Sequence, residues 1–99
     1  MAYRFSRKAA EDLESLYVFG AERFGSEQSE RCYSGLITAL EFLATFPQAA
    51  RARPELGPLT RAHAYRSHLI LYRPDGAGIL IQRIRHGRED WEPRPMGTE

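Results

Sequence analysis

The spacing of apolar residues changes once along this chain of 99 residues, close to residue 60. Before that point, apolar side chains recur every three or four residues, which is typical of helices that bury one face. The first such segment holds Ala9, Leu13, Leu16, Tyr17, Gly20 and Phe24, and the second holds Tyr33, Leu36, Ile37, Leu40, Leu43 and Ala44. After residue 60, apolar and polar residues alternate, as they do in half-buried strands. This sequence of patterns predicts an α+β fold.

Cap and turn residues set the bounds of the elements expected in these two regions. Residues 2–5 alternate and predict a first strand, Ser6 follows where a helix N-cap belongs, and Gly25 separates the two helices. Pro47 ends the second helix, and residues 47–58 predict an ordered loop because they hold three prolines and no apolar periodicity. Three strands are expected next, at residues 60–65, 67–73 and 78–86, with a tight turn at residues 74–76.

The order β-α-α-β-β-β predicts a helical hairpin packed on one face of a small, mostly antiparallel sheet. The last strand departs from simple alternation. Ile79 and Ile81 fall on one face of it, whereas Leu80 and Ile84 fall on the other. A bulge in this strand, or burial of part of both faces, would explain the pattern.

Size and composition narrow the class of protein. One compact domain is expected over residues 1–92, and the Pro- and Gly-rich residues 93–99 are expected to form a loosely ordered tail. The single cysteine, Cys32, excludes an internal disulfide, and the absence of metal-ligand spacings predicts no metal and no cofactor. No apolar run is long enough to span a membrane, and the N-terminus lacks a secretory signal. We therefore expect a cytoplasmic protein without a membrane partner.

Charge is divided unevenly between the two halves of the chain. The net charge is only +1, which argues against broad electrostatic binding of nucleic acid. Residues 1–50 carry five basic and seven acidic side chains, whereas residues 51–99 carry nine arginines and six acids. Because arginine favours bidentate contacts with carboxylate or phosphate, the second half predicts either a local arginine-lined surface or scattered, solvated strand edges.

Phe42 and Phe46 lie one helical turn apart and point away from the apolar stripe of the second helix. Two interpretations remain open. These rings pack against the first helix or a folded-back loop, or they line a groove that binds a partner.

The stretch RIRHGRED, residues 83–90, ends the last strand with a histidine among charged side chains. Cutting RNA without a metal needs a general base, a general acid and cations, and His86, Arg83 and Arg61 are the candidates for these roles. The same end of the sheet suits protein binding, since interface anchors are typically aromatic residues or arginine. We favour non-catalytic binding. The expected target-binding residues are Arg83, Arg85, His86, Arg88 and Trp91.

Five segments in this order carry a family resemblance over nearly the whole chain: YRFSRKAAEDLESLY, FGSEQSERCYSGL, LATFPQAARARPEL, RSHLILYR and RIRHGRED. The chain resembles the ParE branch of the RelE/ParE toxins of bacterial toxin–antitoxin modules, which include plasmid stabilisation systems. Two positions differ from relatives. His86 is not followed by a tyrosine, whereas some ribosome-dependent ribonucleases have a tyrosine at that position. Arg85 precedes His86 at a position where family members usually have an apolar residue.

The resemblance implies a fold, a target and a partner. It implies the β-α-α-β-β-β fold, a toxin that inhibits DNA gyrase by binding it, and neutralisation by a cognate ParD-like antitoxin. Contact with DNA would occur only through the antitoxin complex. An antitoxin helix would cover Val18, Phe19, Phe42 and Phe46. The alternative is a RelE-like, ribosome-dependent mRNA endoribonuclease.

Overall fold

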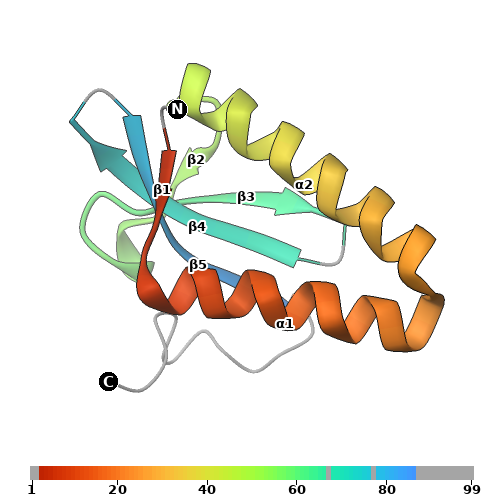
Figure 1. The fold of residues 1–99 in the computed structure, drawn as a ribbon. Coiled ribbons are helices and arrows are strands. Elements are labelled where there is room, and N and C mark those ends of the chain that lie inside the picture. The colour runs from red at the N-terminus through yellow and green to blue at the C-terminus, as the bar shows by residue number, and fades with distance from the viewer. Residues whose placement is uncertain (1–2, 67, 77, 87–99) are drawn as a thin grey trace.

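The computed structural model describes residues 3–66, 68–76 and 78–86. Its elements are β1 (Tyr3–Phe5), α1 (Arg7–Phe24), α2 (Ser26–Thr45), β2 (Arg51–Ala52), the one-turn helix η1 (Pro54–Leu56), β3 (Arg61–Tyr65), β4 (His68–Asp75) and β5 (Gly78–His86). The strands form one sheet in the order β1-β5-β4-β3-β2, in which β1 is parallel to β5 and the other neighbours are antiparallel. The two helices form a hairpin packed against it (Figure 1). The predicted α+β class and architecture are confirmed.

Two details differ from the expected elements. The loop predicted over residues 47–58 contains β2 and η1, which are too short to show a periodic pattern in the sequence. The strand predicted to end at Arg73 continues through Pro74 to Asp75. Pro74 pairs with Ile79 of β5, whereas the pairing of β4 with β3 extends only as far as Tyr72. The described sheet therefore does not require an N–H group from Pro74 on the β3 side of the strand, and the proline is accommodated.

The irregular alternation of β5 results from a bulge. Leu71 of β4 pairs with Arg83, but its neighbour Tyr72 pairs with Ile81, so Gln82 is an extra residue in β5. The extra residue shifts the alternation by one position, which turns Ile84 to the same face as Ile81. The bulge is one of the two explanations that the sequence left open.

The main core lies between the helices and the sheet. Its fully buried side chains are Leu36, Leu40 and Leu43 of α2, Ile70 and Tyr72 of β4, and Ile79 and Ile81 of β5. A smaller cluster lies on the opposite face, where Leu56 of η1 packs with Leu71. Both faces of the sheet are therefore partly buried, and the segment predicted as a loop covers the face that the helices leave open.

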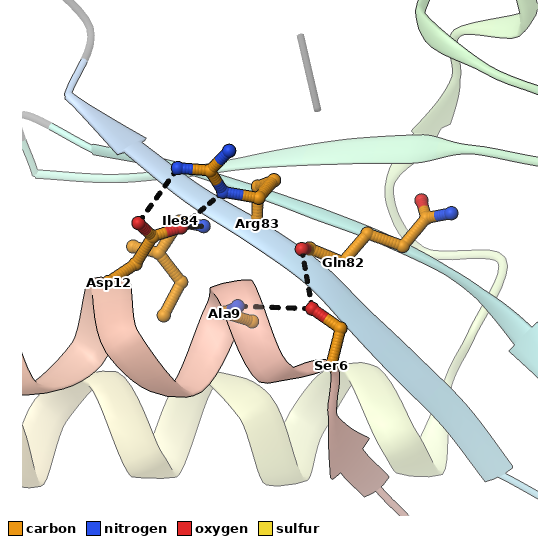
Figure 2. A network of polar contacts seen from close by, with 6 residues as sticks. All are labelled: Ser6, Ala9, Asp12, Gln82, Arg83 and Ile84. Atoms are coloured by element: carbon orange, nitrogen blue, oxygen red, sulfur yellow. Dashed lines mark hydrogen bonds and ion pairs between the residues drawn. The ribbon is translucent and has the colours of Figure 1, made fainter. Parts of the chain in front are cut away.

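Ser6 joins β1, α1 and the bulge of β5. Its amide donates to the carbonyl of Ile81 at 2.9 Å. Its hydroxyl donates to the carbonyl of Gln82 at 2.8 Å and accepts from the amide of Ala9 at 3.0 Å (Figure 2). The predicted N-cap is confirmed, and the same side chain fixes the start of α1 against the bulge.

Replacing Ser6 with alanine is expected to lower the free energy of unfolding by about 1–2 kcal/mol, because the helix loses its cap and the Gln82 carbonyl loses a donor. Urea unfolding followed by circular dichroism measures the change. Ser15→Ala is the matched control: Ser15 is an exposed residue of the same helix, and its replacement is expected to be neutral or slightly stabilising. Equal losses in the two variants would contradict the role assigned to Ser6.

Candidate functional site

The edge of β5 beyond the end of β1 is covered by a side chain of α1. Asp12 Oδ2 accepts hydrogen bonds from the Ile84 amide at 3.0 Å and from Arg83 Nε at 2.6 Å, and Asp12 Oδ1 accepts from Arg83 Nη2 at 2.9 Å (Figure 2). The side chains of Arg83 and Asp12 are only 11% and 17% exposed. Because β1 ends at Phe5, Asp12 takes the place of a neighbouring strand and satisfies a backbone donor of β5.

This arrangement places Arg83 differently from the exposed position that the sequence suggested. The sequence placed it on an exposed rim, either as a target-binding residue or as a cation for phosphate. In the structure its guanidinium is buried and binds both carboxylate oxygens of Asp12. In this position little of the Arg83 side chain is exposed for contact with another macromolecule. Arg83 therefore acts as a positioning residue that holds the end of β5 against α1.

The three residues proposed for ribonuclease chemistry are not brought together. His86 pairs with His68 of β4, whereas Arg61 of β3 pairs with Tyr72 of β4. Residues 68 and 72 are four apart on one strand, which is roughly 13 Å. Arg61 therefore lies at the opposite end of the sheet from His86.

Part of the predicted target-binding set lies outside the described residues. Arg88 and Trp91 follow the last described residue, and the side chain of His86 is likewise outside the described structure. Arg85 is half-buried and pairs with Leu69 of β4. The predicted roles of these four residues remain predictions.

Phe42 and Phe46 are exposed aromatic residues at the end of α2. They are 47% and 57% exposed, and their ring centroids lie 5.4 Å apart. The two rings border an open groove of about 830 Å³, which we call the α2 groove. Its lining residues are Phe42, Thr45, Phe46, Pro47, Gln48, Ala49, Arg61, Pro74, Gly76 and Gly78. The two rings are therefore not packed into the core of the described chain, and their binding of a partner remains a prediction.

Side chains from the sheet hold the α2 groove in shape. The Tyr72 hydroxyl donates to the carbonyl of Pro47 at 2.7 Å, and Arg61 Nη1 donates to the carbonyl of Ala50 at 2.7 Å. Burial raises the pKa of Tyr72, so its hydroxyl keeps the proton that it donates. These bonds fix the segment after α2 before any partner arrives, which reduces the ordering cost of binding.

The opposite wall of the groove is the β4–β5 hairpin. Arg4 of β1 donates from Nε to Asp75 Oδ2 at 3.1 Å, across the strand that lies between them. The neighbouring Arg4 guanidinium holds the pKa of Asp75 below its usual range. Thr45 and Arg61 could not be assigned to this groove from their local sequence, because the segments that line it meet only in the folded chain.

Val18 is exposed but lies apart from the α2 groove. The carbonyl of Tyr17, its neighbour in α1, accepts from the Ser29 hydroxyl near the start of α2. Phe42 lies 13 residues after Ser29 in α2, which corresponds to roughly 20 Å along the helix axis. Val18 and the two phenylalanines are thus at opposite ends of the hairpin. The side chain of Phe19 lies outside the described structure.

The described residues contain neither a metal-binding group nor a membrane-spanning helix. Among them, no group of three or more His, Cys, Asp or Glu side chains is arranged to hold a metal ion. Within the same residues, neither helix combines the length and apolar character needed to cross a membrane.

Comparisons with known proteins agree with this fold. The chain matches the family model described as ParE toxin of type II toxin-antitoxin system, parDE, over residues 3–91. Toxin ParE1 of Caulobacter vibrioides is 31% identical over 84 residues, which is 85% of this chain and 86% of that protein. Toxin ParE1 of Mycobacterium tuberculosis is 32% identical over 89 residues, covering 89% and 91%. A solved chain of the chromosomal ParDE TA system from P. aeruginosa matches with a TM-score of 0.72 at 26% identity, covering 87% of this chain and 95% of that one.

The fold and these matches first define a class, the toxins of type II toxin–antitoxin systems. Within that class, the chain belongs to the ParE toxin family.

Proposed function

We propose that this toxin acts in the bacterial cytoplasm by binding DNA gyrase and inhibiting it, and that a ParD-like antitoxin neutralises the toxin by covering the α2 groove. The observation that carries the antitoxin site is the exposed pair of Phe42 and Phe46 beside a groove held in shape by Tyr72 and Arg61. Exposed aromatic rings next to a preformed depression are typical anchors for an amphipathic helix. Val18 and Phe19 would be covered by a longer antitoxin segment that continues along the hairpin.

The target-binding surface is proposed at the end of β5 and in the residues that follow it. Arg85, His86, Arg88 and Trp91 supply the arginine and aromatic chemistry of interface anchors. Arg83 contributes indirectly, because its contact with Asp12 fixes the strand from which these residues extend.

Two features favour a binder over an enzyme. The cation nearest to His86 in the proposed ribonuclease set, Arg83, is engaged by Asp12, and Arg61 lies at the other end of the sheet. A metal-independent nuclease needs its acid, base and cations around one phosphate. Such a group is not assembled among the described residues.

Purified toxin is expected to inhibit ATP-dependent supercoiling of relaxed plasmid by gyrase, in proportion to the fraction of gyrase molecules that have toxin bound. Added antitoxin is expected to relieve the inhibition. In a reconstituted translation mixture, the same toxin should leave messenger RNA intact. Unimpaired supercoiling would contradict the gyrase proposal. Cleavage of messenger RNA within codons, reduced about 10²-fold or more by His86→Ala, would establish the ribonuclease instead.

A further inference from the structure

The loop that joins β2 to β3 holds a leucine that is both strained and exposed. The backbone of Leu59 has a φ angle of 62°, in the left-handed region that bulky side chains rarely adopt. Its side chain is 70% exposed, which is more than that of any other large apolar residue described. Because this side chain contributes little to the core, packing does not explain why a leucine occupies a strained position.

The turn around Leu59 is of a type that normally contains glycine. The Thr60 amide donates to the Gly57 carbonyl at 3.1 Å and closes a four-residue turn with Pro58 second and Leu59 third. Proline fixes a negative φ angle at the second position, and the positive φ angle at the third identifies a type II turn. Glycine and asparagine are favoured at that third position, so either of them would hold this turn with less strain than leucine.

Buried contacts on both sides of Leu59 hold the turn in place. Leu56 packs into the smaller cluster on the face of the sheet opposite the helices. Thr60 is fully buried, and its hydroxyl donates to Gln82 Oε1 at 2.9 Å. The Arg53 amide donates to the Thr60 carbonyl at 2.8 Å and closes the base of the loop. Leu59 is therefore presented outward by a preformed turn, which lowers the ordering cost of binding.

The surface beside this turn is positively charged. Residues 51–61 hold three arginines and a single acid, Glu55. Hydrogen bonding by Arg53 lowers the pKa of Glu55, and the charge of Arg51 adds to this effect. Arg51 is exposed and pairs with Ala62, which packs against the smaller cluster, so Arg51 points to the same face as that cluster. A partner that receives the exposed leucine would gain from carboxylates around the receiving pocket.

The turn is within reach of the surface proposed for target binding. Gln82, the acceptor for Thr60, is four residues before His86 in β5, which corresponds to roughly 13 Å. An interface of ordinary size involves about 20–30 residues on each side, so one partner can contact both places. Leu59 does not line the α2 groove, where the antitoxin is proposed to bind.

We propose that Leu59 is an apolar anchor that enters a pocket bordered by carboxylates on the protein that the toxin inhibits. Leucine supplies the apolar contact, whereas glycine and asparagine, which would relax the turn, cannot supply it. The proposal rests on the proposed inhibition of a protein target and extends the target-binding surface beyond the end of β5.

Leu59→Asn separates target binding from stability. Asparagine tolerates the left-handed conformation, so the unfolding midpoint of the free toxin is expected to rise by about 2–5 °C. The variant lacks the apolar anchor, so the concentration that half-inhibits supercoiling by gyrase is expected to rise at least about tenfold. Growth arrest of cells that express the toxin, compared at equal toxin levels, is expected to weaken in parallel.

Two further variants control for the position and for the charge. Leu59→Met keeps an apolar side chain on the same strained backbone and is expected to inhibit within about threefold of the unmodified toxin. Arg51→Gln is expected to raise the half-inhibiting concentration about threefold at low ionic strength and less at high salt. The Kd for the antitoxin, measured by calorimetry, is expected to be the same for Leu59→Asn and the unmodified toxin.

Undiminished inhibition and growth arrest by Leu59→Asn would overturn the proposal. A lowered unfolding midpoint would also overturn it, because Leu59 would then serve the fold. A comparable loss of antitoxin affinity would overturn it by assigning Leu59 to the other interface. If the unmodified toxin arrests growth without inhibiting gyrase, the proposed gyrase target is refuted, and growth arrest by Leu59→Asn then decides the role of Leu59.

Discussion

Replacing Asp12 with alanine is expected to lower the free energy of unfolding by about 3–5 kcal/mol, which is a large part of the stability of a small domain. The variant leaves the Arg83 guanidinium buried without its carboxylate and removes the acceptor of the Ile84 amide. Both losses leave polar groups poorly solvated and poorly bonded. Calorimetry should show the unfolding midpoint lowered by roughly 15–30 °C.

Glu11→Ala is the matched control for this prediction. Glu11 precedes Asp12 in the same helix and also contacts an arginine, Arg7, but that pair is exposed, with an N–O distance of 3.6 Å. Exposed pairs of this kind contribute about 0–1 kcal/mol. If Glu11→Ala and Asp12→Ala unfolded alike, the contact between Asp12 and Arg83 would have no special energetic role.

A second variant separates the charge from the hydrogen bond. Asp12→Asn keeps an oxygen that accepts from the Ile84 amide but removes the negative charge beside Arg83. We expect a loss between those of Glu11→Ala and Asp12→Ala. In the Asp12→Ala background, Arg83→Met is expected to recover part of the stability. The second substitution removes the buried guanidinium charge, which the first substitution had deprived of its carboxylate.

Local patterns in the sequence were sufficient to predict most of the fold. The helix boundary at Ser6 depends on a hydroxyl that acts within its own turn, and the stripe on α2 depends on a period of 3.6 residues. The bulge at Gln82 was detectable because it shifts the phase of the isoleucines on either side of it. By contrast, β2 pairs through only two residues, which are too few to show a period.

The site was harder to predict, because burial of a charged side chain depends on contacts between distant residues. Arg83 is close to other arginines in the sequence, and this pattern predicts that it is exposed at the end of the sheet. Its partner Asp12 is 71 residues away, and nothing in the local pattern distinguishes Asp12 from the exposed acids around it. The positions of Phe42 and Phe46 were easier to predict, because the helical period alone places these apolar residues away from the apolar stripe of the second helix. The groove beside them was not visible, because Arg61 and Pro74 come from other elements.

Replacing both phenylalanines, with Phe42→Asp and Phe46→Asp, is expected to weaken antitoxin binding about 10³-fold or more. Two central aromatic anchors are lost, and two carboxylates enter an interface that excludes water. The toxin itself should lose no more than about 2 kcal/mol, from the contact between the rings and from negative charge near the end of α2. Calorimetric titration with the antitoxin and thermal unfolding of the free toxin measure the two effects separately.

The two new charges need a control of their own. Ala10→Asp with Ser15→Asp places the same two carboxylates at exposed positions of α1, and we expect that variant to bind antitoxin normally. Val18→Asp reports separately on the far end of the hairpin, where a weaker effect is expected because Val18 lies apart from the groove. Collapse of the fold in the double phenylalanine variant would show that the rings belong to the core. Unchanged affinity in a folded double variant would move the antitoxin away from α2, since no interface centred on these rings could bury two carboxylates without loss.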